Sequence, residues 1–588
     1  MQPGRVKLLP GLLQDRVELN RAYLMSLSND NLLQNFYFEA GLASFRQKPE
    51  DIHWGWESPT CQLRGHFLGH WLSAAAHLYA ATGDAEVKAK ADTIVSELGR
   101  CQEANGGEWV GSIPEKYLDF VVAGQRVWAP QYTLHKTLMG LYDMYALAHN
   151  EQALDILRKW ARWFHRWTGQ FSREQMDDIL DVETGGMLEV WANLYGVTQR
   201  EQHLELLRRY DRPRLFEPLL AGEDVLTNMH ANTTIPEILG AARAWEVTGE
   251  PRWRDIVEAY WRMAVTERGY FCTGGQTCGE VWTPPHEQAA RLGDKNQEHC
   301  TVYNMMLLAD RLMQWTGDLS YADYWERNLY NGILAQQHHQ TGMIAYFLPL
   351  QAGGVKRWGT PTNDFWCCHG TLVQAHMLHT SAIYYEDADG LVVAQYLPSE
   401  VTWERSGTAV HVKQTVDRQT STTRRPNAQV FEIAVECEQP ADFTIKLRVP
   451  WWVAGASHIT INGEQIEAQS DSPGVIAIKR AWQNDRIRIT LPKQLTSHPL
   501  PDQPSTVAFM DGPVVLAGLC DEERVLIGDK DDPTSLLMPD NEREWSNWMT
   551  GYRTHNQDRN FRLLPLYQIL DQRYTVYFPV QSANTTTI

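Results

Sequence analysis

The sequence has few cysteines, no strongly basic segment and no long apolar run. Nine of its 588 residues are cysteine, an odd number spread along the chain, which favours reduced thiols and a few metal ligands over a disulfide framework. A net charge of −19 without a run of five basic residues excludes a nucleic-acid partner. No stretch approaches the ~18 apolar residues of a membrane span, and residues 1–20 lack the apolar core of a signal peptide. We therefore expect a cytoplasmic protein without membrane contact.

Flat side chains with a polar edge are abundant, with 23 tryptophans and 23 tyrosines. Sugar-binding clefts use such surfaces, although aromatic rings also fill gaps between helices in a large core. The chain is too long for one ordinary hydrophobic core, so we expect a large domain and one or two smaller ones. Composition thus favours a multidomain protein and slightly favours a carbohydrate ligand.

Residues 12–385 have apolar residues at helical spacing, as in Leu68, Leu72 and Ala75. Similar helix ends recur along this region, and a sixth end fits residues 384–389. Such a period indicates stacked helix pairs, in an open solenoid or a closed ring. Six hairpins with long polar loops favour a closed (α/α)6 barrel, with its function in the loops at one rim. The first five ends lie at residues 81–84, 148–151, 197–200, 247–250 and 315–318.

The pattern changes after Gly390 to short segments that alternate with period two and are broken by turns such as Asn462-Gly463. This alternation predicts antiparallel strands, with the polar stretch 528–560 as a loop. The predicted architecture is α+β and multidomain. An (α/α)6 barrel over residues 1–387 is followed by a β-sandwich region over 388–588, in one or two small sandwiches.

Two of the nine cysteines, Cys367 and Cys368, are adjacent. A strained vicinal disulfide, two buried core thiols or a metal site would each account for the pair. Zinc is commonly bound by about four cysteine, histidine or carboxylate ligands, and Glu298 and Cys300 form a second ligand set upstream. Residues two apart do not share a helix face, so Glu298 and Cys300 can converge on one ion only at a helix start or in a bent loop.

Four histidines and one glutamate stand in polar motifs of the helical region. His66 and His70 share a helix face, which suits a metal or, without a third ligand nearby, sugar hydroxyls. His135 and His230 lie in motifs where helices are predicted to begin; capping does not explain His230, and a place inside its helix is the alternative for His135. Glycines before Glu280 hold it in a loop, where it could donate a proton, although an exposed surface glutamate is the alternative.

Residues 298–305 read Glu-His-Cys-Thr-Val-Tyr-Asn-Met, and residues 365–371 read Phe-Trp-Cys-Cys-His-Gly-Thr. These motifs resemble those of the β-L-arabinofuranosidases of glycoside hydrolase families 127 and 146, and their residues are more similar to those of family 146. The resemblance covers nearly the whole chain. Further counterparts lie at residues 63–67, 128–135, 230–233, 330–334, 512–517 and 573–577.

The resemblance implies an exo-acting, retaining glycosidase that releases L-arabinose from β-L-arabinofuranosides, in an (α/α)6 barrel with β-sandwich domains behind it. It implies Zn²⁺ held by Glu298, Cys300, Cys367 and Cys368, with Cys367 as nucleophile and Glu280 as acid/base. Zinc coordination would deprotonate and orient the thiol, and a retaining pair predicts about 5 Å between Glu280 and Cys367. We expect a small-molecule or oligosaccharide substrate bordered by the four histidines. A homodimer is one possible assembly.

The family pattern is not followed at every position. Leu372-Val373-Gln374 stands where family 146 has Gly-x-Glu, and Leu188 replaces a usual asparagine. These changes leave the zinc and nucleophile assignment intact, but they make a different plant-derived sugar an alternative substrate. A second alternative is a non-catalytic carbohydrate-binding protein with a structural zinc, because four protein ligands normally form a closed structural site.

Overall fold

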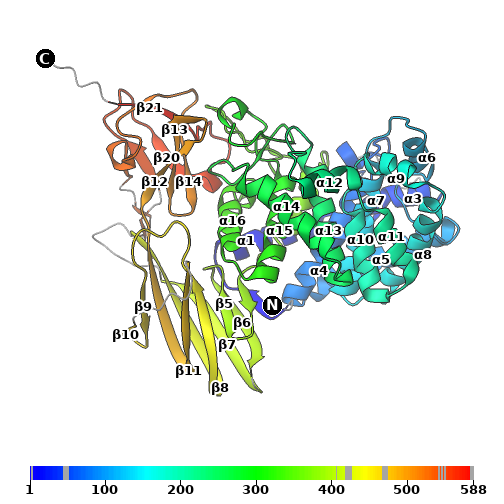
Figure 1. Ribbon diagram of the computed structural model, residues 1–588, viewed down its shortest axis with the longest axis horizontal. Coiled ribbons are helices and arrows are strands. Elements are labelled where there is room, and N and C mark those ends of the chain that lie inside the picture. Colours follow the sequence, from blue (N-terminus) through cyan, green and yellow to red (C-terminus); the bar gives the residue numbers. More distant parts are fainter. Residues whose placement is uncertain are drawn as a thin grey trace.

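The computed structural model describes residues 1, 4–43, 52–405, 407–417, 427–466, 474–540, 543–544, 547–548 and 551–582. A helical body built from the N-terminal part of the chain lies beside two β units (Figure 1). Among these described residues, no helix combines the length and the apolar character needed to cross a membrane.

Six buried helices form a closed ring. Each contacts the next one, and the sixth, α17, returns to the first, α4. The first two helices approach closely at Gly69 and Gly140, where a Cβ atom would collide with the backbone of the opposite helix. The ring confirms the predicted (α/α)6 barrel. Its helices are α4 (His66–Thr82), α7 (Pro130–Ala146), α10 (Met187–Thr198), α13 (Ile235–Thr248), α15 (His299–Thr316) and α17 (Cys367–Ala375).

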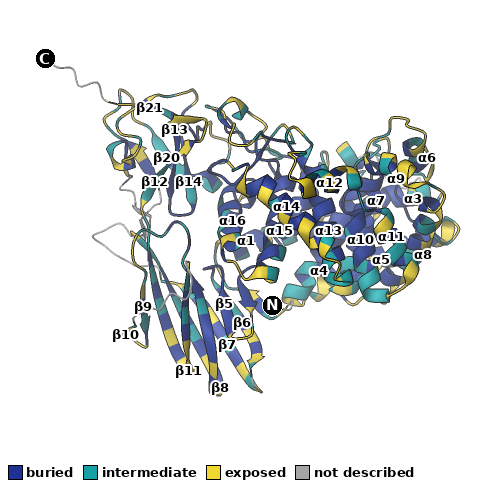
Figure 2. Ribbon diagram, viewed as in Figure 1, coloured by how far each residue is buried: buried dark blue, intermediate teal, exposed yellow. Residues whose placement is uncertain are grey.

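An outer layer of helices covers the ring and turns its polar faces to solvent (Figure 2). Polar caps start several of them: Asp84 accepts hydrogen bonds from two backbone N–H groups of α5, and Asn150 accepts one from α8. Asn20 of α1 donates to the backbone carbonyl of Val373 in α17 at 2.8 Å, which places α1 over the sixth ring helix. The outer helices are α1 (Leu12–Ser26), α5 (Ala85–Ala104), α8 (Glu151–Thr168), α11 (Glu201–Arg209), α14 (Pro251–Trp261) and α16 (Ser320–Asn328).

Five of the six predicted helix ends are confirmed. Gly83, Gly249 and Gly317 follow α4, α13 and α15 with φ of 74°, 70° and 71°, a conformation that ends a helix and favours glycine. The sixth predicted end, at residues 384–389, is wrong, because α17 already ends at Ala375 and part of that segment forms strand β4. The last ring helix is short, and the chain leaves it without a second helix.

The first β unit is a nine-stranded sheet in the order β1-β6-β7-β8-β11-β9-β10, with β5 beside β8 and β4 beside β5. It is antiparallel except for the β5–β8 pair. Alternate side chains of the two longest strands, β8 and β11, are buried, as the period of two predicts. Its strands are β1 (Val6–Leu8), β4 (Tyr384–Glu386), β5 (Gly390–Val393), β6 (Ser399–Arg405), β7 (Thr408–Val416), β8 (Ala428–Arg448), β9 (His458–Ile461), β10 (Glu464–Gln465) and β11 (Val475–Pro492).

The second β unit is an eight-stranded sheet in the order β15-β21-β13-β14-β20-β19-β16, with β12 beside β13. The expected loop at 528–560 is partly wrong, because β16 and β19 pair within it and β17 (Arg543–Glu544) pairs with β18 (Asn547–Trp548). These strands have only two or three residues, too few to show alternation. The sheet consists of β12 (Leu495–Leu500), β13 (Gln503–Asp511), β14 (Val514–Gly518), β15 (Leu526–Ile527), β16 (Leu537–Pro539), β19 (Tyr552–Thr554), β20 (Arg562–Pro565) and β21 (Phe578–Gln581).

Candidate active site

The two predicted ligand sets come together at the starts of two neighbouring ring helices. Cys367 and Cys368 open α17, while Glu298 precedes α15 and Cys300 lies in its first turn. The Sγ atom of Cys368 lies 3.3 Å from that of Cys300 and 3.8 Å from that of Cys367, and Glu298 Oε1 lies 3.9 Å from Cys367 Sγ. All four residues are buried, and their potential ligand atoms lie within 4.8 Å of one another. The predicted convergence at a helix start is confirmed.

The donor set of this cluster fits a zinc ion, since three thiols and one carboxylate are ligands that zinc prefers. The cysteines are free, which leaves no vicinal disulfide. Burial raises the pKa of Glu298, Cys300 and Cys368. Burial also opposes ionisation of Cys367, but hydrogen bonds with Cys300, Cys368 and Tyr346 outweigh it and hold the pKa of that thiol well below its usual range. Cys367 is therefore the thiol of the cluster that ionises most readily.

A short hairpin carries Glu280 to this cluster. Strands β2 (Thr277–Cys278) and β3 (Val281–Trp282) flank Gly279 and Glu280, whose φ values are 60° and 71°. A glutamate rarely adopts this left-handed conformation, and such residues cluster at functional sites. The Glu280 carbonyl accepts a hydrogen bond from the Ala231 N–H at 2.8 Å, and its Oε2 lies 3.8 Å from Nε2 of His230. The hairpin thus places Glu280 beside His230.

Tyr346 links Glu280 to Cys367. Its hydroxyl donates a hydrogen bond to Glu280 Oε1 and accepts one from Cys367 Sγ at 3.3 Å. The carbonyl of Tyr346 accepts a hydrogen bond from the His299 N–H at 3.1 Å, and its ring centre lies 5.7 Å from that of Trp366. Burial and the nearby Cys367 raise the pKa of Tyr346 above its usual range, so its hydroxyl stays neutral. One hydroxyl group therefore contacts both predicted catalytic residues.

A cavity of about 80 Å³ lies in front of Cys367. Its rim contains two indoles, Trp56 and Trp128, whose ring centres lie 4.9 Å apart and meet edge to face. Flat rings with a few converging polar groups are typical of a small-ligand site and suit a sugar. Besides Tyr132, Tyr346 and Cys367, the polar part of the lining consists of Glu183, His230, Asn232, Glu280 and Glu298.

His230 lines this cavity, whereas the other three predicted substrate histidines are not among its lining residues. His66 and His70 are buried in α4, where Nδ1 of His66 lies 3.0 Å from a backbone carbonyl and Nδ1 of His70 lies 2.5 Å from Gln374 Oε1. His135 is buried in α7, and its Nδ1 has no hydrogen-bond partner among the described residues. Burial lowers the pKa of His70 and His135, which keeps both rings neutral. A contact of these three with substrate stays a prediction.

Sequence reasoning missed two groups of the site, Tyr346 and Glu183. Burial, followed by the nearby Cys367, raises the pKa of Glu183 to about 8, so at neutral pH its carboxyl can both donate and accept hydrogen bonds. Glu183 stands two residues before the pair Gly185-Gly186, a glycine-rich setting like that of Glu280. That similarity is the signal that could have found it. Tyr346 has no comparable signal.

Comparison with known proteins gives consistent matches. The family model of the β-L-arabinofuranosidase GH127 catalytic domain matches residues 5–381, and that of the GH127 middle domain matches 390–493. A curated relative from Bifidobacterium longum subsp. longum, named a non-reducing end β-L-arabinofuranosidase, is 24% identical over 312 residues. The match spans 45% of this chain and 45% of the relative, so the chain spans less than half of that protein.

Two solved structures share the fold over nearly their full length. A GH127 β-L-arabinofuranosidase from Geobacillus stearothermophilus T6 is 20% identical with a TM-score of 0.73, over 98% of this chain and 100% of that one. A second GH127 β-arabinofuranosidase is 18% identical with a TM-score of 0.75, over 99% and 97%. Since the catalytic-domain model alone covers residues 5–381, the chain belongs to the GH127 β-L-arabinofuranosidase family, a family of glycosidases.

Proposed function

We propose that this protein is an exo-acting, retaining β-L-arabinofuranosidase that releases L-arabinose, with Cys367 as nucleophile and Glu280 as acid/base. The observation that carries the proposal is the shared contact with Tyr346, which holds an easily ionised thiol and a carboxyl group on either side of one hydroxyl. Both groups line a cavity with aromatic walls. The name of the Bifidobacterium relative supports the choice of sugar.

Glu298, Cys300, Cys367 and Cys368 would hold the zinc ion in this proposal. When bound, the ion would supply positive charge that keeps the thiols deprotonated and fixes the direction of their sulfur atoms. Buried acidic groups this close to one another repel once ionised, which is the physical reason to expect a cation among them.

The proposed reaction has two steps. The Cys367 sulfur forms a bond to the anomeric carbon while the bond to the leaving oxygen breaks, and Glu280 gives its proton to that oxygen. The Glu280 carboxylate then takes a proton from water as the water oxygen attacks the same carbon and the carbon–sulfur bond breaks. The sugar leaves with its original anomeric configuration, and both residues return to their starting states.

The departures from the family pattern do not favour a different sugar. Leu188 is buried in α10, and Leu372 packs in one apolar cluster with the cysteines. Gln374 donates a hydrogen bond to Ser73 at 2.7 Å. None of these three lines the cavity, so their effect on sugar choice would be indirect.

Replacement of the nucleophile tests the proposal. Cys367→Ser should lower kcat/KM on an aryl β-L-arabinofuranoside by more than about 1,000-fold, because a serine hydroxyl is a weak nucleophile at neutral pH. Cys437→Ser, at a buried cysteine of β8, is the matched control and should keep activity. NMR of the first product should show the β anomer. Substantial turnover by Cys367→Ser, or early release of the α anomer, would contradict the mechanism.

A further inference from the structure

A second cavity lies directly behind Tyr346. Its volume is about 360 Å³, within the usual range of ligand sites, and Tyr346 lines both it and the cavity in front of Cys367. Trp366, the residue before the proposed nucleophile, forms part of its wall. The two cavities therefore adjoin at Tyr346.

The larger cavity lies on the acid/base side of the site. The N–H of Gly279, next to Glu280, donates to the carbonyl of Lys295 at 2.8 Å, and Lys295 lines the larger cavity. As the acid, Glu280 must reach the glycosidic oxygen, which joins the arabinose to the leaving group. The part of the substrate beyond that oxygen would therefore enter this cavity.

The lining of the larger cavity is cationic, although the whole chain carries a net charge of −19. Lys295, Arg357 and Arg573 line it together with one carboxylate, that of Asp294. Among the described residues, neither Lys295 nor Arg357 has a hydrogen bond or ion pair from its side chain, and both are exposed. Arg573 donates to the Gly353 carbonyl at 3.0 Å, which leaves other N–H groups of its guanidinium free of protein partners. Positively charged groups without ion pairs among the described residues thus line the cavity on the side of Glu280.

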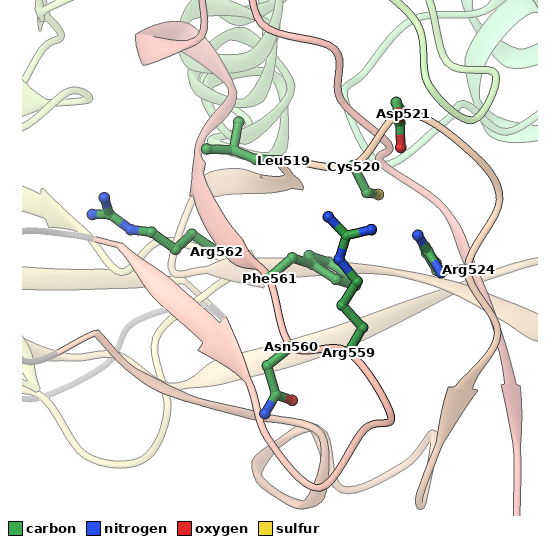
Figure 3. Close-up of a pocket in the computed structure, with 8 residues that line it drawn as sticks. All are labelled: Leu519, Cys520, Asp521, Arg524, Arg559, Asn560, Phe561 and Arg562. Atoms are coloured by element: carbon green, nitrogen blue, oxygen red, sulfur yellow. The ribbon is translucent and has the colours of Figure 1, made fainter.

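A third cavity, of about 310 Å³ in the second β unit, provides a contrast (Figure 3). It is also rich in arginine, but Arg524 pairs with Glu522 at 2.6 Å and Arg562 pairs with Asp540 at 2.6 Å. No residue of the proposed catalytic pair lines it. Two of its three arginines are thus paired within the protein, whereas neither Lys295 nor Arg357 behind Tyr346 has an ion pair among the described residues.

We propose that the cavity behind Tyr346 is the leaving-group subsite and that it selects an aglycone sugar carrying a carboxylate, as a uronic acid does. This inference rests on the proposed glycosidase function. The fork of an arginine matches a planar carboxylate with two parallel hydrogen bonds, and the rings of Trp366 and Phe347 offer flat surfaces to a sugar. Because Arg573 belongs to the C-terminal region, the second β unit would take part in substrate choice.

Two matched disaccharides test the inference. One is a β-L-arabinofuranosyl galacturonic acid and the other its methyl ester, which differ by one charge. Wild-type protein should hydrolyse the acid with a kcat/KM about tenfold higher than the ester, the effect of one charge-assisted hydrogen bond. Arg357→Gln and Arg573→Gln should each bring this ratio toward one. Lys479→Gln on β11 and Arg559→Gln in the third cavity remove the same charge elsewhere and should leave the ratio unchanged.

Binding without turnover separates this inference from the proposed function. Calorimetric titration with free galacturonate and with galactose should show tighter binding of galacturonate, and Arg357→Gln should remove the difference. Equal ratios for acid and ester in the wild type, or a preference that survives in both arginine variants, would overturn the inference while the glycosidase proposal stands. If no arabinofuranoside is cleaved, the proposed function fails, and the titration alone decides whether the cavity selects a carboxylate. Galactose sulfate binding as tightly as galacturonate would overturn the choice of a carboxylate.

Discussion

Removal of the Tyr346 hydroxyl is the sharpest test of the site geometry. Tyr346→Phe deletes one oxygen atom that accepts a hydrogen bond from Cys367 Sγ and donates one to Glu280. The ring should keep its place, because its centre lies 4.5 Å from that of Phe347 and 5.7 Å from that of Trp366, and because its backbone carbonyl is held by the His299 N–H. The variant should therefore fold and lose only the two contacts.

The expected loss follows from the charge of the two partners. A hydrogen bond to a charged group contributes about 1.5–3 kcal/mol, which corresponds to a fall of roughly 10- to 150-fold in kcat/KM. The loss should lie mainly in kcat, because the contacts are to reacting groups.

Tyr384→Phe is the matched control. It removes a buried hydroxyl that lies 2.9 Å from Ser399 Oγ in the first β unit and does not line the cavity in front of Cys367. Its kinetics should equal those of the wild type. A Tyr346→Phe enzyme within twofold of the wild-type kcat/KM would refute the argument that this hydroxyl couples the two residues.

Three further predictions concern other groups. Glu280→Gln should lower kcat/KM by more than about 100-fold on an alkyl glycoside and much less on an aryl glycoside, whose leaving group needs no proton; equal losses on both would exclude Glu280 as the acid. A chelator should remove activity and lower the unfolding temperature, and Zn²⁺ should restore both. A free ion concentration 100 times the Kd stabilises the folded state by about 2.7 kcal/mol. Burial raises the pKa of Asp143 to about 6 in the folded protein. Its ionisation therefore lowers the free energy of unfolding at pH values above the pKa of the unfolded state, and this loss grows until the pH passes about 6. Asp143→Asn should thus be more stable than the wild type by about 2 kcal/mol at pH 7, with a smaller gain at pH 4; an equal difference at both pH values would contradict the assignment.

The ring helices could be predicted from the sequence because local signals mark their ends. Gly83, Gly249 and Gly317 each follow a helix with apolar residues at spacings of three and four, and each takes the left-handed conformation that stops it. The sixth helix has no such signal. Its nine residues begin with Cys367, end at Ala375 without a glycine, and lead into irregular chain. Its boundary follows from the two cysteines at its start and from packing, which periodicity does not report.

The cluster of Glu298 and three cysteines was predictable for a different reason. Cysteine is rare in this chain and zinc ligands are chemically restricted, so Cys300, Cys367 and Cys368 could be grouped by residue type before any geometry was known. Tyrosine and glutamate are common, and neither Tyr346 nor Glu183 differs in type from dozens of structural residues. Their roles depend on position alone.

The loop that carries Tyr346 contacts the C-terminal part of the chain. Its loop lies between α16 and α17 and is held by the second β unit, where Lys356 donates to the carbonyls of Leu566 and Ile569 at 2.8 Å each, and Tyr574 donates to the Gly354 carbonyl at 2.9 Å. Lys356 is buried and its pKa lies well below its usual range through burial, so these two carbonyls are its essential partners. A barrel without the C-terminal unit would keep the cysteine cluster and the contact of Tyr346 with His299, but would lose these contacts to residues 354–356 of the same loop. The C-terminal β unit therefore supports the loop that carries Tyr346, a contact between distant segments that sequence periodicity does not report.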